Sequence, residues 1–485
     1  MTDRHPQTKS RATPFVAIAC GGTGGHFFPG IAIARALQER GCETALLISN
    51  KDVDQQIAAG CPDLQTLSLP AVACQNGELF GFAAGCWNSW KVCVRFFRQR
   101  KPQAVLAMGG FTSAPPVLAA KFFGSAVCLH EANSIPGRAN RWLAPMADRV
   151  FVGFRKASRS LLHQSVWVTG TPVRSEFSPL DPAACRMSLG LEANRPVLLI
   201  VGGSQGASAI NDLLVRALPG LVKRAPDLQF VHLTGGADHA KVSAAYRAYQ
   251  RRSVVLPFLT EMELALGAAT LAVSRAGASS LSEFASMQLP SILVPYPAAA
   301  DNHQFYNART FAEAGAAHLL DQQAATPEIL TDLILGLVQN HNNCDAMKAA
   351  LARCHFPNAA QTIAQSMLDL ILERSCANSN WNSPHPSCGH PPHEPGRDAF
   401  HRVRAFDARD SGRGGVAQIF NLLYRGIVSC RAATTSGALE IVNALPITNR
   451  RYGRLKVCAT LVQQQPQALT AYGWGEASHF ESCLE

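Results

Sequence analysis

The sequence lacks several signals that would place it in large classes of protein. It has no run of about 20 uninterrupted apolar residues, the length that an α-helix needs to cross a bilayer. Residues 1–13 are polar and lack the apolar core of a secretory signal. None of its 15 cysteines forms a Cys-x-x-Cys pair, and some, such as Cys20 and Cys128, stand within apolar runs. We therefore expect a flexible N-terminus at 1–13, reduced core cysteines, and neither a membrane span nor export.

The G-x-G-x-x-G fingerprint of dinucleotide-binding folds is also missing, which argues against nicotinamide chemistry. Two other glycine-rich turns are present instead, GGTGGH at residues 21–26 and GGSQGA at residues 202–207, each between an apolar run and a helical pattern. Such a turn lets a ligand approach the backbone N–H groups of a helix N-terminus, where the helix dipole favours negative charge. One turn in each half predicts two nucleotide-type α/β domains that face a shared cleft.

Short apolar runs alternate with amphipathic stretches from residue 15 onward, a pattern typical of parallel sheets covered by helices on both faces. The expected strands are 15–20, 44–48, 65–69, 104–107, 126–129, 149–152 and 166–168 in the first half, and 197–201, 229–233, 253–256, 271–274, 291–294 and 317–320 in the second. A proline-rich stretch between Gly170 and Pro196 separates the halves. We predict two doubly wound parallel-sheet domains, residues 14–175 and 176–374, that bind ligands at the carboxyl ends of their strands.

The sequence changes character after Arg374. Residues 375–485 begin with a stretch rich in Pro, His, Ser and Asn and continue without the alternation of strands and helices. Cys388, His390 and His393 fall short of a four-ligand metal set, so we interpret this stretch as a flexible linker. Residues 418–425 and 447–455 share a loose pattern of Ile, Asn, Tyr and Arg. The extension is either a low-structure segment of unknown role or translated repeat DNA.

Polar residues follow the expected strands in both halves. His26 stands after the first glycine-rich turn, where it can accept a proton near neutral pH or simply pack against the turn. We expect Pro29 to lie near the first turn of the helix, where its missing N–H costs nothing. The loops 108–113 and 130–133 reach the same edge. In the second half, Glu283 can hold the two hydroxyls of a ribose or simply favour a helix N-terminus.

These motifs, in order along the chain, resemble those of the N-acetylglucosaminyltransferases of peptidoglycan synthesis, a family of GT-B glycosyltransferases. The matching segments are 21–26 with Pro29, 109–113, 130–133, 170–174, 202–207, 275–278 through Glu283, and 301–304 with 307–308. The resemblance covers about residues 14 to 374 and leaves out the extension. Ala132 departs from it, because many relatives carry glutamine there.

The resemblance implies inverting transfer of N-acetylglucosamine from its UDP conjugate to the C4 hydroxyl of the N-acetylmuramyl unit of lipid I, forming lipid II. His26 is our candidate for the general base, with Glu131 as the second choice. The implied donor site comprises Ser204 at the diphosphate, Leu259 at the uracil, Glu283 at the ribose with Ala278, Ser279, Ser280, Leu281 and Ser282 beside it, His303 and Gln304 at the sugar, and Thr23, Gly24, Gly25, Asn133 and Arg174 across the cleft.

No metal or cofactor is expected, because backbone N–H groups and a helix dipole can stabilise departing UDP. Some glycosyltransferases use an Asp-x-Asp metal motif, and Asp52 and Asp54 form such a pair. They stand at the start of an expected helix, so we interpret them as helix-capping residues. Other functions stay open: a GT-B transferase with another lipid acceptor, an epimerase of UDP-N-acetylglucosamine, or a non-catalytic nucleotide-sugar-binding module. A dehydrogenase is the least favoured.

Residues 79–101 combine bulky apolar side chains with cations. The apolar ones are Leu79, Phe80, Phe82, Trp87, Trp90, Val94, Phe96 and Phe97, and the cations are Lys91, Arg95, Arg98, Arg100 and Lys101. Such a helix can lie in the interface of an anionic bilayer or pack on the sheet as an ordinary amphipathic helix. The net charge of +10 suits an anionic partner but does not by itself choose one. Because the acceptor that the resemblance implies is a lipid, we expect peripheral attachment to the cytoplasmic face of the membrane, and no nucleic-acid partner.

Overall fold

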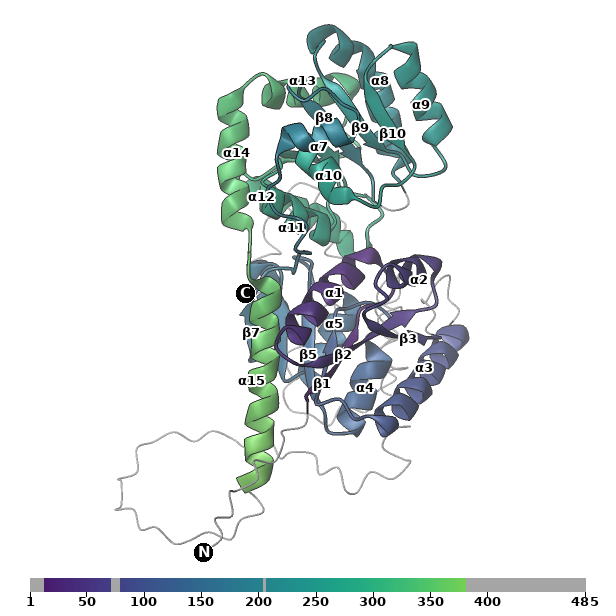
Figure 1. The fold of residues 1–485 in the computed structure, drawn as a ribbon, viewed down its shortest axis with the longest axis vertical. Coiled ribbons are helices and arrows are strands. Elements are labelled where there is room, and N and C mark those ends of the chain that lie inside the picture. Colours follow the sequence, from purple (N-terminus) through teal and green to yellow (C-terminus); the bar gives the residue numbers. More distant parts are fainter. Residues whose placement is uncertain (1–12, 71–78, 204–205, 381–485) are drawn as a thin grey trace, which may run out of the picture. The chain divides into compact units, whose positions relative to one another are not determined.

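Two parallel sheets organise the chain in a computed structural model that describes residues 13–70, 79–203 and 206–380 (Figure 1). The first has the strand order β3-β2-β1-β4-β5-β6-β7, and the second has the order β10-β9-β8-β11-β12-β13. Every pair of neighbouring strands is parallel. The order reverses between β1 and β4 and again between β8 and β11, and a doubly wound sheet binds its ligands at such a reversal. The predicted fold class is thus confirmed.

The first lobe is built from strands and helices in alternation. Its elements are β1 (Phe15–Ala19), α1 (Gly24–Gln38), β2 (Glu43–Ser49), α2 (Asp52–Ala59), β3 (Gln65–Leu69), α3 (Leu79–Gln99), β4 (Ala104–Ala107), α4 (Ala114–Phe122), β5 (Ala126–Glu131), α5 (Arg138–Leu143), η1 (Ala144–Met146), β6 (Arg149–Val152), α6 (Arg155–Ser158) and β7 (Val166–Val168). β1 and β4 are buried along their whole length, as strands covered on both faces should be.

The second lobe repeats the pattern. Its elements are α7 (Pro182–Ser188), β8 (Val197–Val201), α8 (Ser208–Arg224), β9 (Gln229–Leu233), α9 (His239–Ala248), β10 (Ser253–Leu256), α10 (Met262–Ala268), β11 (Leu271–Ser274), α11 (Ala278–Met287), β12 (Ser291–Leu293), η2 (Ala300–Asn302), α12 (His303–Glu313), β13 (His318–Leu319), α13 (Pro327–Val338) and α14 (His341–Cys354). The stretch expected to separate the halves contains α7, whose N-cap Asp181 accepts a hydrogen bond from the N–H of Ala183 at 3.1 Å.

The expected strands are all present, most with the expected bounds, but β5 is longer than predicted. His130 and Glu131, expected in a loop, are its last two residues, and both are buried. Their backbones complete the ladder with β6, so the loop begins only at Ala132. The correction matters because a strand fixes the direction of the Glu131 side chain more tightly than a loop does.

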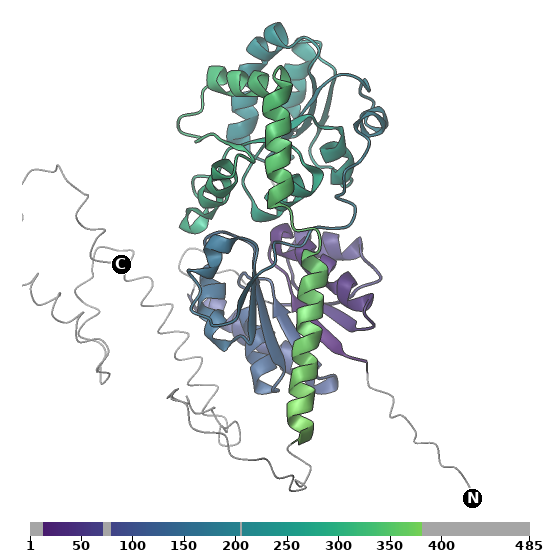
Figure 2. The ribbon, with the colours of Figure 1, turned by 90° about the vertical axis from the view of Figure 1, so that its left-hand side faces the viewer.

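The last helix, α15 (Ala359–Asn380), follows the second lobe in sequence and packs on the first (Figure 2). Its buried Ile363, Ala364 and Met367 belong to the same core as Ile18 of β1 and Ile33 of α1. The opposite face of the first sheet has a core of its own, which α3 and α4 cover. α15 continues past the expected boundary at residue 374.

Several expectations fall outside the described residues. They concern the N-terminus before residue 13, the extension after residue 380 with Cys388, His390, His393 and its two similar pieces, and Ser204 and Gln205 of the second glycine-rich turn. Among the residues that the structure describes, no helix is both long and apolar enough to cross a membrane.

Candidate functional site

The first glycine-rich turn runs directly into α1. The helix begins at Gly24 with Thr23 as its N-cap, and the N–H groups of His26 and Phe27 both donate to the carbonyl of Thr23 at 3.1 Å. The side chains of Thr23 and His26 also meet, with 3.1 Å between Oγ1 and Nδ1. His26 therefore lies in the first turn of α1, directly beyond the carboxyl end of β1.

Pro29 lies deeper in α1 than predicted, as the sixth residue of the helix, and its missing N–H does have a consequence. In an α-helix that N–H would donate to the carbonyl of the residue four positions earlier, which is Gly25. The Gly25 carbonyl instead accepts a hydrogen bond from Ser279 Oγ at 2.9 Å. Ser279 belongs to α11 of the second lobe. Because Pro29 has no N–H, the Gly25 carbonyl remains available for this hydrogen bond between the two lobes.

The His26 ring packs under the turn between β4 and α4. Gly109 and Gly110 have φ values of +106° and +77°, and a Cβ on Gly110 would lie 3.3 Å from His26 Cε1. Only glycine combines this backbone conformation with such a close approach of the ring. Burial lowers the pKa of His26 to about 4, and the nearby charge of Asp54 opposes that shift.

Asp54 is not the capping residue that we predicted. The N-cap of α2 is Lys51, and the buried Asp54 carboxylate points back to the glycine-rich turn. Its Oδ2 accepts the N–H of Gly22 at 2.6 Å, and also the N–H and hydroxyl of Ser49 at 3.0 and 2.5 Å. The other side of the turn is held by Thr112, whose Oγ1 donates to the carbonyl of Gly21 at 2.8 Å.

Glu131 organises the loop that follows β5. One carboxylate oxygen accepts the N–H and the side-chain amide of Asn133 at 2.8 and 3.1 Å, and the other accepts the N–H of Gly137 and the amide of Asn140 at 2.8 and 2.9 Å. The side chain is buried. Both of its oxygens are thus committed to holding the loop.

Asn307 of α12 connects this loop to the second lobe. Its Oδ1 accepts the N–H of Ser134 at 2.8 Å, and its Nδ2 donates to Asn133 Oδ1 at 3.0 Å and to the carbonyl of Ala276 at 3.2 Å. Beside it, Phe154 after β6 packs edge-on against Phe311, with ring centroids 6.1 Å apart. Phe154 was not among our candidates, and Asn307 was named only within the matching segment 307–308, because a single residue gives no sign of a partner so distant in sequence.

Glu283 and Arg174 act on each other electrostatically. Burial raises the pKa of Glu283 to about 7, and the positive charge of Arg174 opposes that rise. The Arg174 guanidinium lies over the rings of Phe28 and Phe177, at 4.4 and 4.6 Å from their centroids. Its buried Nε has no hydrogen-bond partner in the described part of the chain.

His303 and Gln304 begin α12. Gln304 Oε1 accepts the N–H groups of Ala276 and Tyr296 at 3.3 and 3.0 Å, and His303 Nδ1 lies 2.7 Å from the carbonyl of Ala300. Asp301, which we grouped with them, forms an ion pair with Arg141 of the first lobe at 2.5 Å. Of this cluster, Asp301 is therefore already paired.

The second glycine-rich turn is described at its two ends. The N–H of Gly206 donates to the carbonyl of Gly203 at 2.9 Å, and α8 begins two residues later, as expected. A buried chain of hydrogen bonds supports the start of α8: His232 Nε2 lies 2.9 Å from Asn211 Oδ1, and Asn211 Nδ2 donates to Asp238 at 2.8 Å. Leu259 lies in the loop after β10 and packs on the core of this lobe.

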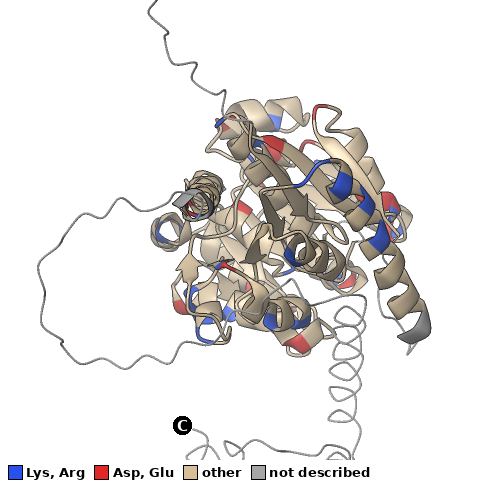
Figure 3. Cartoon of the chain, turned by 90° about the horizontal axis from the view of Figure 1, so that it is seen from below, with Lys and Arg blue, Asp and Glu red and all other residues tan. Residues whose placement is uncertain are grey.

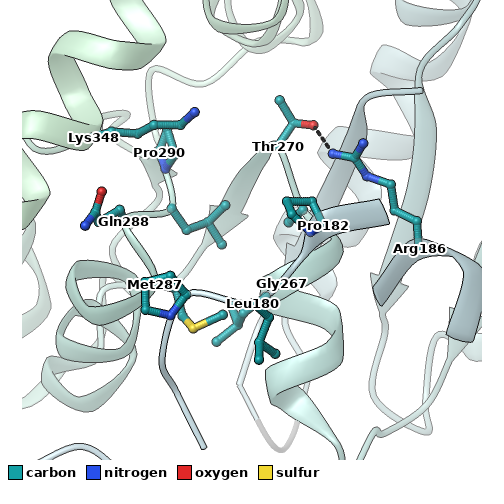
Figure 4. Close-up of a pocket in the computed structure, with 13 residues that line it drawn as sticks. Leu180, Pro182, Arg186, Gly267, Thr270, Met287, Gln288, Pro290 and Lys348 are labelled. Carbon is teal, nitrogen blue, oxygen red and sulfur yellow. Dashed lines mark hydrogen bonds between the residues drawn. The ribbon is translucent and has the colours of Figure 1, made fainter. Parts of the chain in front are cut away.

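A separate cavity of about 310 Å³ lies in the second lobe (Figure 4). Its walls include residues 266–270 and 287–290, which precede β11 and β12. Arg186 closes one side and donates to Thr270 Oγ1 at 3.2 Å. The cavity therefore lies at the amino ends of these strands, at the opposite edge of the sheet from the glycine-rich turn.

α3 divides into a buried face and an exposed one. Val94 and Phe97 lie in the core, whereas Trp87 is 43% exposed and contacts Trp90. Phe122 of α4, 53% exposed, adjoins Trp90 with 6.3 Å between ring centroids. Lys91, Arg95 and Arg98 are exposed on α3, which contains no Asp or Glu. Figure 3 draws the Lys and Arg residues of the described part of the chain in blue. Arg100, by contrast, forms an ion pair with Glu43 and stacks on Phe15.

Comparisons with known proteins agree over both lobes. Residues 16–152 match the model of the glycosyltransferase family 28 N-terminal domain, and residues 197–363 match that of its C-terminal domain. The UDP-N-acetylglucosamine–N-acetylmuramyl-(pentapeptide) pyrophosphoryl-undecaprenol N-acetylglucosamine transferase of Syntrophotalea carbinolica is 36% identical over 357 residues, which are 71% of this chain and 96% of the relative.

Solved structures show the same likeness. The crystal structure of MurG from Acinetobacter baumannii is 29% identical, with a TM-score of 0.59, over 74% of this chain and 99% of that one. A putative UDP-N-acetylglucosamine 2-epimerase from Listeria monocytogenes has a TM-score of 0.57 at 17% identity, over 75% of this chain and 98% of that one. At that identity the second likeness shows the fold alone.

Proposed function

Because the chain belongs to the family of UDP-N-acetylglucosamine–N-acetylmuramyl-(pentapeptide) pyrophosphoryl-undecaprenol N-acetylglucosamine transferases, within glycosyltransferase family 28, we propose that it transfers N-acetylglucosamine from UDP-N-acetylglucosamine to the C4 hydroxyl of the muramyl unit of lipid I. The product is lipid II. The observation that carries the proposal is the hydrogen bond of Ser279 Oγ to the Gly25 carbonyl. It brings together the start of α1, which bears His26, and the start of α11, which bears Glu283.

The donor occupies the carboxyl edge of the second sheet. Glu283 accepts hydrogen bonds from the ribose hydroxyls, with residues 278–282 beside it, and Leu259 lies at the uracil. The oxygen of Gln304 is committed to two backbone N–H groups. Its amino group therefore donates to the sugar, with His303 next to it, and Ser204 binds the diphosphate.

The first lobe completes the donor site and supplies the base. Thr23, Gly24, Gly25 and Asn133 face the sugar and diphosphate. His26 accepts the proton of the C4 hydroxyl as that oxygen attacks the anomeric carbon from the side opposite UDP, and the bond from this carbon to the phosphate oxygen breaks. The geometry favours His26 over Glu131, because both oxygens of Glu131 are occupied by the loop that it holds.

UDP leaves with the electron pair of the broken bond. Arg174 stands near Glu283 with an unpaired Nε, and it stabilises the growing charge on the diphosphate together with the N–H groups of the second glycine-rich turn. The low pKa of His26 keeps the ring neutral at physiological pH. A neutral imidazole is the form that can take a proton.

The lipid acceptor places the enzyme at a membrane surface. Trp87, Phe122 and the cations Lys91, Arg95 and Arg98 form the membrane-facing patch of the first lobe, at the cytoplasmic face of the membrane. Apolar side chains beside cations suit the interface of an anionic bilayer. Arg100 is engaged with Glu43 and does not belong to this patch.

Transfer from labelled UDP-N-acetylglucosamine by the full-length protein, with and without lipid I, tests the function. We expect labelled lipid II only when lipid I is present. His26→Ala should lower kcat about 100-fold or more, since general bases contribute on that scale, and leave donor affinity intact. His341→Ala, which changes an exposed histidine of α14, is the matched control.

Three results would contradict the proposal. Donor binding without turnover would indicate a nucleotide-sugar-binding module. Epimerised sugar nucleotide in the absence of lipid I would indicate an epimerase, and transfer to other lipids alone would indicate another acceptor. Undiminished turnover of His26→Ala would remove His26 from the mechanism.

A further inference from the structure

We propose that Asp54 is a positioning residue for the reaction, which holds the first glycine-rich turn in place and supports proton transfer to His26 with its negative charge. This inference rests on the proposed function. Asp54 hydrogen-bonds to Gly22 and Ser49, so its role acts through the turn and through its charge.

The carboxylate of Asp54 is built into the turn. Oδ2 accepts from the N–H of Gly22 at 2.6 Å and from Ser49 twice, at 3.0 Å from its N–H and 2.5 Å from its hydroxyl. Hydrogen bonds to an ionised acceptor are roughly twice as strong as neutral ones. Asp54 thereby fixes the peptide between Gly21 and Gly22, just before Thr23, the N-cap of α1, and hence the point from which His26 projects.

The same side chain brings a buried negative charge close to His26. Asp54 is fully buried, and its Oδ1 has no hydrogen-bond partner within residues 13–70, 79–203 and 206–380. Burying a carboxylate is costly unless it is paired or hydrogen-bonded. Three hydrogen bonds offset this cost at Oδ2, whereas Oδ1 adds negative charge without a partner of its own.

Other titratable groups near His26 act in the opposite direction. His303 of α12 lowers the pKa of His26, and His130 of β5 is electrostatically coupled to it. The buried Cys20 thiol near Asp54 has a raised pKa and stays neutral. Among the described residues, Asp54 is the group whose charge favours the imidazolium that forms when the sugar hydroxyl loses its proton.

Four variants of the full chain separate these effects. Asp54→Asn removes the charge, and Asp54→Glu keeps it on a longer side chain. Ser49→Ala removes one hydrogen bond and leaves the charge in place. Asp52→Asn, an exposed residue of the same helix, makes the same chemical change as Asp54→Asn without touching the turn. Each is assayed for kcat against pH and for amide hydrogen exchange of the segment 20–27.

For Asp54→Asn we expect kcat to fall about 100-fold, as it does when reacting groups are misplaced by about 1 Å. The acidic limb of its pH profile should move to lower pH, because the imidazolium has lost a stabilising charge. Asp54→Glu should return the limb toward its original position. Ser49→Ala should lower kcat less and leave the limb in place, and Asp52→Asn should match the unaltered protein.

Exchange in segment 20–27 should be faster in Asp54→Asn than in Asp52→Asn. An unmoved limb in a folded Asp54→Asn protein, or a limb that moves to higher pH, overturns the charge effect. Unchanged exchange overturns the holding role. If Asp54→Asn does not fold, a Ser49→Ala protein with unaltered kcat and exchange contradicts the proposal. If the unaltered protein has no transferase activity, the proposed function is contradicted instead. Hydrogen exchange of segment 20–27 in Asp54→Asn and Asp52→Asn then still decides whether Asp54 holds the turn.

Discussion

At the scale of single residues, the site depends on the space around the His26 ring. Gly110 leaves room for that ring at a positive φ of +77°, whereas Gly41 has nearly the same φ, +76°, with nothing within 4 Å of a Cβ. The two glycines thus share a backbone conformation, but only at Gly110 would a Cβ crowd the His26 ring. This pair lets the cost of the backbone conformation be separated from the cost of crowding His26.

We predict that Gly110→Ala and Gly41→Ala each lower the free energy of unfolding by about 1 kcal/mol or more, since alanine is strained at positive φ. Only Gly110→Ala should also lower kcat, because its methyl group displaces His26. Urea unfolding and the transfer assay measure the two effects. Equal activity of the two variants would show that the ring tolerates the added methyl group.

Glu283 gives the donor site a pH dependence. Its pKa of about 7 means that a large share of the side chain is protonated at pH 6, and a protonated carboxyl accepts hydrogen bonds poorly. We expect UDP-N-acetylglucosamine to bind more tightly as the pH rises from 6 to 8, as isothermal titration calorimetry can measure. Glu283→Gln should bind about tenfold more weakly at pH 8, having lost a charged acceptor, with no such pH dependence. A steep dependence retained in that variant would assign the titration to another group.

Residue identities were enough to propose the residues of the candidate site, but not their hydrogen-bond partners. His26, Glu283 and Gln304 could be proposed because their types and motifs carry the signal. The partners of Asp54 and Asn307 could not, since Asp54 bonds to Gly22, 32 residues away, and Asn307 bonds to Asn133, 174 residues away. The amino-acid type alone gave capping as the simplest interpretation of Asp54, and only tertiary structure shows which N–H groups the carboxylate meets.

At the scale of elements, α1 combines a glycine-rich start with an internal proline, both unfavourable in a helix. Pro29→Ala supplies an N–H to the Gly25 carbonyl, which then depends less on Ser279. We predict that Ser279→Ala destabilises the Pro29→Ala protein less than it destabilises the original. Urea unfolding of the two single variants and the double variant measures this coupling. If the effects of the two substitutions on the free energy of unfolding are strictly additive, the Gly25 carbonyl does not exchange the Ser279 hydroxyl for the N–H that Pro29→Ala supplies.

The membrane-facing patch can be tested on α3. We expect replacement of Lys91, Arg95 and Arg98 by glutamine to weaken binding to vesicles that contain anionic lipid by about 100-fold, from about 1 kcal/mol for each cation near the surface. The control replaces Arg216, Lys223 and Arg247, which are exposed on α8 and α9. Sedimentation with vesicles gives the affinities, and an equal loss in both triple variants would contradict a specific role of α3.

Strands were easier to predict than helix ends. The runs of β4 and β8 are apolar throughout, and these largely buried strands match the expected ranges residue for residue. The start of α1 was harder, because glycines have a low helix propensity and only the Thr23 cap and contacts with neighbouring loops place Gly24 and Gly25 in the helix. Tertiary contacts override propensity there.

At the scale of the whole molecule, the first lobe owes part of its core to the last helix. Ile363 of α15 is fully buried in that core, and Leu351 of α14 is fully buried in the core of the second lobe. We predict that Ile363→Ala, at a cost of about 2–5 kcal/mol, accelerates hydrogen exchange in β1, α1 and β5. Leu351→Ala should accelerate it in the second lobe. If both variants accelerate hydrogen exchange in the same segments, the two cores are not independently stabilised.

Because α15 follows the second lobe in sequence but packs on the first, it also affects the order in which the two lobes can fold. Domains generally fold from the N-terminus as the ribosome releases them, but the core that β1 and α1 share on one face of the first sheet is completed only when α15 has been synthesised. The lobe that begins first can therefore finish only after its neighbour. A nascent chain that ends after α14 would carry a complete second core, while Ile18 and Ile33 still lacked their contacts with α15.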